Sequence, residues 1–115
     1  MRFVIDIDGT VLTQQKPGEY HLATPLAGAV EAVNALYDAG HQVVFHTTRN
    51  YKYMRQTLES LTAFGFKFHH VCFGKPHGDI FIDDRALRFT DWGRMNEQIA
   101  QRMSELAAPS QTGTE

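Results

Sequence analysis

The sequence lacks three features that would place a protein in a specialised class. Its single cysteine, Cys72, excludes an intrachain disulfide. It has no basic run, and 11 Lys and Arg residues against 13 Asp and Glu residues give a formal net charge of -2. Nothing therefore indicates binding to nucleic acid or to an anionic membrane surface. Its longest apolar run is far shorter than the ~20 residues that span a bilayer.

The start of the chain and its size indicate an ordinary globular domain. Met1 and Arg2 lead directly into an apolar run, so we expect no secretory signal. A length of 115 residues, 43% hydrophobic and 21% charged, suits one domain with a single core. We expect a cytoplasmic enzyme or binding domain, with neither a membrane nor a nucleic acid as partner.

The chain opens with the stretch Phe3-Val4-Ile5-Asp6-Ile7-Asp8-Gly9-Thr10, in which an apolar run leads into two acidic residues. Such a run is typical of a strand buried on both faces of a parallel sheet, and Gly9 indicates a sharp turn. Asp6 and Asp8 lie two residues apart, so their side chains point the same way. Two neighbouring carboxylates repel each other unless a cation lies between them, and Mg²⁺ suits an all-oxygen site. The alternative is that both serve only in a turn or as caps.

Strand and helix patterns alternate along the rest of the chain. The polar segment Val11–Thr24 is expected to form a flap or hairpin, and a helix is expected from the N-cap Thr24 to Gly40. The further elements expected are a strand at Gln42–Thr47, a helix after the N-cap Asn50 and before Gly65, strands at His70–Phe73 and Ile80–Asp84, and a helix at Trp92–Leu106. We expect one domain over residues 1–108 and a disordered tail at 109–115.

This alternation predicts βαβ units and a parallel sheet with right-handed crossovers. Ligands of such sheets bind beyond the carboxyl ends of the strands, where the strand order reverses. Polar residues stand at four predicted strand ends: Asp6 with Asp8, Thr47, Lys75, and Asp83 with Asp84. The sequence therefore predicts one site to which all four strand ends contribute.

These side chains suit phosphoryl transfer from a phosphate monoester. Mg²⁺ and the Lys75 ammonium would neutralise the phosphate, and the Thr47 hydroxyl would orient its oxygens. One carboxylate of the pair Asp6 and Asp8 can attack phosphorus to form an aspartyl-phosphate. The other can protonate the leaving alkoxide and then deprotonate the attacking water. The acidic pair after the fourth strand would complete the metal shell.

The string Asp6-Ile7-Asp8-Gly9-Thr10 resembles the first motif of the haloacid dehalogenase (HAD) superfamily of phosphohydrolases. The other motifs follow in the same order: Thr47 after an apolar strand, Lys75 before Pro76, and Asp83-Asp84 after an apolar strand. The resemblance covers residues 3 to about 92 and implies a three-layer, Rossmann-like α/β fold with a central parallel sheet. Three further strings resemble small capsule or polysaccharide biosynthesis phosphatases: Phe73-Gly74-Lys75-Pro76, Gly78-Asp79 and Ile82-Asp83-Asp84-Arg85-Ala86.

The resemblance implies a role for each acidic residue of the motifs. Asp6 would be the nucleophile and a Mg²⁺ ligand. Asp8 would be the general acid and base and would bind the metal through its backbone carbonyl. Asp83 would be the third protein ligand to Mg²⁺ with Asp84 supporting it, and which of these two bonds the metal stays open.

The resemblance also implies that Thr47 and Lys75 hold the phosphoryl group. Thr48 is the alternative to Thr47, and the strand register favours Thr47. Arg49 could contact a phosphate or sugar of the substrate, or it could form an ion pair at the surface.

Many superfamily members carry a cap domain between these motifs, and this chain has little room for one. Only 36 residues separate Thr10 from Thr47, and 27 separate Thr47 from Lys75. We therefore expect a capless HAD-like domain with an open site. Selection of the substrate would then depend on the flap, on a neighbouring subunit of a homo-oligomer, or on a large substrate.

Other candidates have less support. A zinc site is not favoured, because no CxxC or HxxxH spacing links His69, His70, Cys72 and His77. His46 is expected to be a packed, hydrogen-bonded histidine and Trp92 a core residue. Lys16 and Tyr20 in the flap could contact the substrate, whereas flap residues are usually only solvated.

We therefore expect a Mg²⁺-dependent phosphomonoester hydrolase that works through an aspartyl-phosphate, with a small sugar phosphate as substrate. The alternatives are a phospho-acceptor signalling domain of the receiver type and a catalytically silent HAD-like binding protein. A receiver has its adjacent acidic pair on the first strand and its phosphorylated Asp on the third, whereas here the pair follows the fourth strand and DxD the first. The presence of all four motifs argues against a silent protein.

Overall fold

The structure is a computed structural model that describes residues 1–108, so the tail expected at 109–115 lies outside it. Three strands form one parallel sheet in the order β1-β2-β3: β1 (Arg2–Asp6), β2 (Gln42–Thr47) and β3 (His70–Phe73). The parallel α/β architecture is confirmed, and β2 and β3 have the predicted bounds. Strand order does not reverse within residues 1–108, because the fourth strand that would reverse it is not formed.

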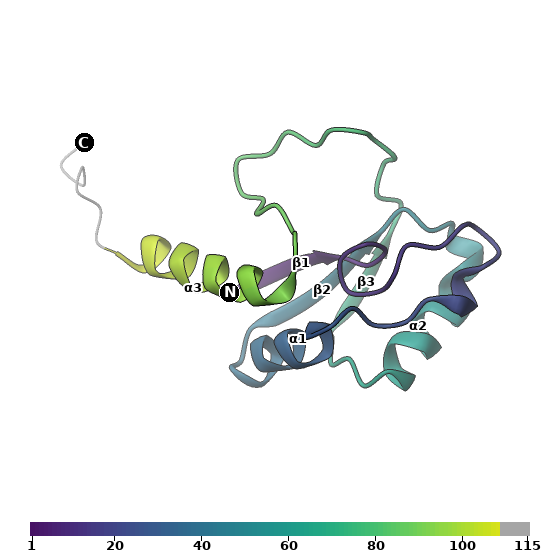
Figure 1. The fold of residues 1–115 in the computed structure, drawn as a ribbon, viewed down its shortest axis with the longest axis horizontal. Coiled ribbons are helices and arrows are strands. Elements are labelled where there is room, and N and C mark those ends of the chain that lie inside the picture. Colours follow the sequence, from purple (N-terminus) through teal and green to yellow (C-terminus); the bar gives the residue numbers. More distant parts are fainter. Residues whose placement is uncertain (109–115) are drawn as a thin grey trace.

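Three α-helices accompany the sheet: α1 (Ala29–Asp38), α2 (Met54–Ala63) and α3 (Trp92–Ala107). Two short 3-10 helices, η1 (Tyr20–Leu22) and η2 (Tyr51–Tyr53), lie in the connections. Figure 1 shows α1 and α2 on the same side of the sheet, while the segment between β3 and α3 arches away on the other side. In residues 1–108, no helix combines the length and the apolar character needed to cross a membrane.

The core lies on the sheet face that carries Ile5, Phe45 and Val71, which stand opposite one another in the strand register. Phe45 is fully buried, and its ring lies edge-on to Phe66 with the centroids 5.7 Å apart. On the opposite face of β1, Val4 is 58% exposed. The apolar face thus fixes the register and brings the carboxyl ends of the strands to one edge.

The predicted start of the first helix at Thr24 is wrong, because α1 begins at Ala29. Residues before it are extended and pair with the other end of the predicted flap. The Thr13 N–H donates to the carbonyl of Thr24 at 2.8 Å, and the Leu26 N–H donates to that of Val11 at 2.9 Å. Helical conformation would break these bonds, so the helix begins only after them.

The second helix has the predicted cap. The Asn50 side chain accepts a hydrogen bond from the Lys52 N–H at 2.9 Å. The first turn after it is the 3-10 helix η2, and the α-helical part begins at Met54. The α2 helix ends before Gly65, as expected.

The predicted strand Ile80–Asp84 is not formed. No backbone hydrogen bond joins it to the sheet within the part of the chain that is described, and Ile80 and Ile82 are 82% and 97% exposed. The Asp83 carboxylate instead accepts from the Arg85 N–H at 2.7 Å, which stabilises a local turn. An apolar run becomes a strand only where a neighbour satisfies its backbone groups, and the run alone does not specify that neighbour.

Helix α3 joins the domain through its first turn. Trp92 and Met95 are buried, with 3% and 7% of their surface exposed, which confirms Trp92 as a core residue. The indole N–H of Trp92 donates to the carbonyl of Thr10 at 2.8 Å. Gly28 allows this approach, since a Cβ there would lie 3.3 Å from the Trp92 Cβ and its φ is +80°. The helix therefore packs directly behind the turn that follows β1.

Candidate active site

A tight turn after β1 places the two motif carboxylates at the edge of the sheet. The Ile7 carbonyl accepts from the N–H groups of the three residues at 10, 11 and 12, at 2.9 to 3.1 Å. Gly9 has a φ of +84°, a conformation that favours glycine. Asp6 ends the strand, and its Oδ2 accepts from the Thr10 hydroxyl at 3.3 Å. The turn therefore leaves Asp6 and Asp8 on the same side, as their spacing predicts.

Lys75 reaches the same place from the end of β3. Its backbone N–H donates to the carbonyl of Thr47 at 3.1 Å, which holds the residue close to the end of β2. Its ammonium lies 3.1 Å from Oδ1 of Asp6, and the two side chains are 18% and 31% exposed. The ammonium also lies 4.7 Å from the centroid of the Phe81 ring. The structure thus brings together a carboxylate and a cation from strand ends 69 residues apart.

A polar cavity of about 190 Å³ opens at this edge of the sheet. Its lining residues are Asp6, Asp8, Gln14, Thr48, Lys75, His77, Gly78 and Phe81. The two acidic residues and the lysine are sequence-predicted site residues. Gln14, His77 and Phe81 were not predicted here, because only the fold of the two loops places them at the cavity.

Thr48, not Thr47, lines this cavity. Thr47 is 1% exposed, and its hydroxyl accepts from the Arg49 N–H at 3.0 Å. The strand register favoured Thr47, whereas Thr48 is the threonine that lines the cavity. The difference arises because the chain turns at the end of β2.

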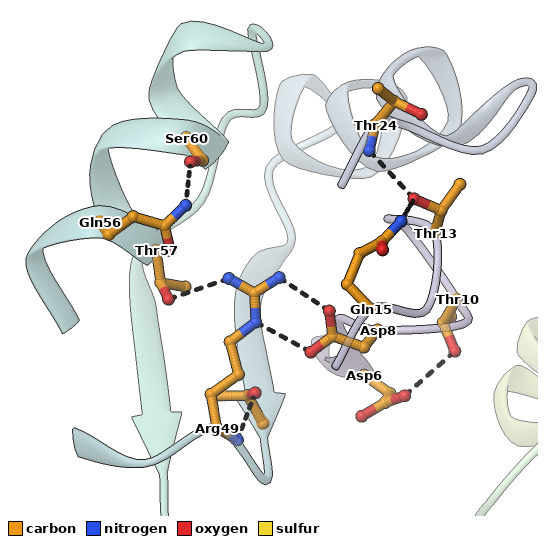
Figure 2. A network of polar contacts seen from close by, with 11 residues as sticks. Asp6, Asp8, Thr10, Thr13, Gln15, Thr24, Arg49, Gln56, Thr57 and Ser60 are labelled. Atoms are coloured by element: carbon orange, nitrogen blue, oxygen red, sulfur yellow. Dashed lines mark hydrogen bonds and ion pairs between the residues drawn. The ribbon is translucent and has the colours of Figure 1, made fainter. Parts of the chain in front are cut away.

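Arg49 does not line the cavity and its side chain is fully buried, so neither a substrate contact nor a surface ion pair describes its position. Its Nε and Nη2 donate to Oδ2 and Oδ1 of Asp8 at 2.9 and 2.7 Å. Its Nη1 donates to the Thr57 hydroxyl at 3.1 Å, as Figure 2 shows. Its guanidinium carbon lies 4.1 Å from the centroid of the Tyr20 ring, so Tyr20 is packed and not solvated as expected. No pattern in the sequence indicated these three partners, which come from separate segments.

Asp83 and Asp84 are exposed and do not line the cavity. Across residues 1–108, no group of three His, Cys, Asp or Glu side chains is arranged to hold a metal ion. The expected cluster of four carboxylates is therefore not assembled in this arrangement, because the fourth strand that would carry two of them is not formed.

Two titratable groups near the site have shifted pKa values. Burial lowers the pKa of His46, the charge of Lys75 lowers it further, and Asp6 acts in the opposite direction. Burial raises the pKa of the Tyr20 phenol, and the charge of Asp8 adds to this while Arg49 opposes it. Both groups are therefore neutral near pH 7 in this environment.

The fold and the site together define an α/β protein with carboxylates and a lysine at the carboxyl edge of a parallel sheet. Residues 3–77 match the family model described as haloacid dehalogenase-like hydrolase, and the chain belongs to this family. The matched range contains Asp6, Asp8, Thr47 and Lys75 but ends before the acidic pair at 83 and 84. We conclude that the protein is a HAD-type hydrolase domain.

One solved structure supports the fold independently. A crystal structure of a structural-genomics target from Vibrio cholerae aligns with 88% of this chain and 98% of its own, with a TM-score of 0.61 and 19% identity. At this identity, the likeness bears on the fold alone. No curated protein matches the sequence significantly.

Proposed function

We propose that this HAD-type hydrolase is a phosphatase that acts on phosphate monoesters through an aspartyl-phosphate. The observation that carries the proposal is the pairing of the Asp6 carboxylate with the Lys75 ammonium, 3.1 Å apart, in a polar cavity at the strand ends. The cation can neutralise a phosphoryl oxygen while the carboxylate attacks phosphorus. Both side chains stay partly exposed, so a ligand can reach them.

The chain supplies groups for both steps of such a reaction. One Asp6 oxygen forms a bond to phosphorus as the bond to the leaving alkoxide breaks, and Asp8 gives its proton to that alkoxide. Asp8 then takes a proton from water, whose oxygen attacks phosphorus and releases Asp6 and inorganic phosphate. Lys75 and Thr48, or Thr47 as the sequence favours, hold the phosphoryl oxygens.

The oxygen donors at this edge of the sheet are of the type that binds Mg²⁺, but only two of the three expected protein ligands lie there. The Asp6 carboxylate and the Asp8 carbonyl are hard oxygen ligands of the sort that Mg²⁺ prefers. Arg49 orients both Asp8 carboxylate oxygens, and the Asp8 backbone carbonyl is the donor that the family resemblance implies for the metal. Asp83 or Asp84 would supply the third ligand, and the bound ion would neutralise charge on the phosphoryl group.

We further propose that the segment 79–84 pairs with the free edge of β1 when the site is loaded. Within residues 1–108, β1 has β2 as its one strand neighbour, so its outer edge has unpaired backbone groups. The exposed run Ile80-Phe81-Ile82 has the composition of a strand. Parallel pairing would carry the acidic pair to the edge where Asp6 lies.

For the substrate we propose a small sugar phosphate. The cavity of about 190 Å³ is polar, and Gln14 and His77 in its lining offer hydrogen-bonding groups that suit sugar hydroxyls. Because the site is open, a neighbouring subunit of a homo-oligomer could add contacts to the substrate, and this oligomer stays a prediction.

The test is phosphate release from a panel of phosphomonoesters with and without Mg²⁺. We expect metal-dependent turnover that Asp6→Asn lowers by about a thousand-fold or more, because the nucleophile is lost. Asp38→Asn is the matched control, since Asp38 pairs with Lys67 at an exposed position, 2.8 Å apart and away from the cavity. Equal turnover by Asp6→Asn and the native protein would contradict the proposal.

A further inference from the structure

Arg49 is a buried cation that does not face the cavity. Its side chain is 0% exposed, whereas that of Asp8 is 10% exposed and lines the cavity. Arginine is rarely buried in full unless its donors are paired. Here its three guanidinium nitrogens each donate once, two to Asp8 and one to the Thr57 hydroxyl.

These contacts fix the guanidinium from three directions. Thr57 lies on α2, and Tyr20, in η1, places its ring 4.1 Å from the guanidinium carbon. Figure 2 shows Arg49 between Asp8 on one side and Thr57 on the other. The bidentate pair then fixes the plane of the Asp8 carboxylate, since two parallel N–H···O bonds prevent its rotation.

We propose that Arg49 is a positioning residue that aims the Asp8 carboxylate at the oxygen of the leaving group. The inference rests on the proposed phosphatase function, in which Asp8 transfers protons. Each Asp8 oxygen accepts one bond from Arg49, so its second lone pair is free for the reacting oxygen. Proton transfer needs heavy atoms about 2.6–3.2 Å apart, so a carboxylate free to rotate would lose much of its effect.

A purely structural ion pair would leave a different signature. If Arg49 only stabilises the fold, its replacement lowers activity equally on all substrates. If it positions an acid, the loss grows as the leaving group becomes more basic, because a poor leaving group depends more on protonation.

The experiment measures kcat/KM for 4-nitrophenyl phosphate and phenyl phosphate, two esters of similar shape whose leaving groups differ in basicity. Arg49→Lys keeps a cation but cannot form the bidentate pair. We expect it to lower the ratio of kcat/KM for phenyl over 4-nitrophenyl phosphate by about ten-fold, with little change in KM. Arg102→Lys is the matched control, since Arg102 lies on α3 away from the cavity and should leave the ratio unchanged.

Thr57→Val is the second variant, which tests the inference if Arg49→Lys does not fold. It removes the hydroxyl that accepts from Nη1 and keeps the shape, so the ratio should fall in the same direction by about two- to five-fold. An equal loss on both esters, or a rise in KM alone, overturns the inference and leaves the phosphatase standing. A native protein whose turnover of both esters is no greater than that of Asp6→Asn overturns the proposed function and the inference with it.

Discussion

At the scale of single residues, Trp92 connects a helix to the turn that carries the site. Its indole N–H donates to the Thr10 carbonyl, and its side chain is 3% exposed. Trp92→Phe keeps an aromatic ring but leaves this carbonyl without its partner. We expect a loss of about 1–3 kcal/mol in the free energy of unfolding, measured by urea denaturation. Unchanged stability would mean that the bond contributes nothing.

His46 gives a second prediction at this scale, on stability against pH. Burial and the charge of Lys75 lower its pKa below the ordinary value of 6.5, so the unfolded chain binds a proton more readily than the folded one. The contribution of neutral His46 to the free energy of unfolding is therefore fully present above its ordinary pKa of 6.5, and it is lost as the pH falls through the lowered pKa of the folded protein. We expect the Tm of the native protein to fall between about pH 7.5 and pH 5.5, and that of His46→Gln to fall less.

The measurement is a thermal unfolding series for both proteins in the presence of a chelator, so that metal binding does not contribute. An equal fall in both Tm values would show that other groups cause the whole effect.

The sequence indicated the residues of the site whose positions depend on local pattern. Asp6 and Asp8 were predicted from an apolar strand that leads into a glycine turn. Lys75 was predicted from its place after the strand His70–Phe73. The Asp8–Arg49 pair could not be predicted, because it joins residues 41 apart through the fold. The choice between Thr47 and Thr48 depends on the direction in which the chain turns, which strand periodicity does not specify.

At the scale of elements, the segment 79–84 and the free edge of β1 make a testable pair. We expect the amides of residues 80–82 to exchange rapidly with solvent in the metal-free protein, since no backbone bond to the sheet protects them in this arrangement. With Mg²⁺ and vanadate, a mimic of transferred phosphate, pairing with β1 should slow their exchange by about ten-fold or more. Hydrogen exchange read by mass spectrometry measures this.

Asp83→Asn together with Asp84→Asn provides the control for this prediction. Without these carboxylates, Mg²⁺ and vanadate should no longer protect the segment. Protection that persists in this variant would mean that closure does not depend on the acidic pair.

Elements with strong local signals were predicted well, and those that depend on distant pairing were not. The bounds of β2 and β3 match the apolar runs, since each run has a neighbour to pair with. The predicted start of α1 was too early because residues 24–26 form backbone hydrogen bonds with residues 11–13. The capping pattern in the sequence does not indicate this pairing. The fourth strand was predicted from composition, which does not fix a partner.

At the scale of the whole molecule, the core extends beyond the region that defines the family. The family match ends at residue 77, yet Trp92 and Met95 belong to the core cluster. We expect a chain that ends after residue 90 to lose about 3–5 kcal/mol or more relative to one that ends after residue 108. Total stabilities of domains are about 5–15 kcal/mol, so this loss is a large part of the whole.

Urea denaturation of the two truncated chains measures this difference. Equal unfolding midpoints would mean that α3 packs on a domain that is already complete without it.

The buried Arg49 has a consequence for the evolution of this domain. Replacing Asp8 would leave the Arg49 charge buried without its carboxylate partner. Replacing Asp6 would leave only the partly exposed Lys75 without its partner. Replacing Asp6 can therefore abolish catalysis with a smaller loss of stability than replacing Asp8. We expect lineages that abandon catalysis while keeping this fold to replace Asp6 first and to retain Asp8 and Arg49 together.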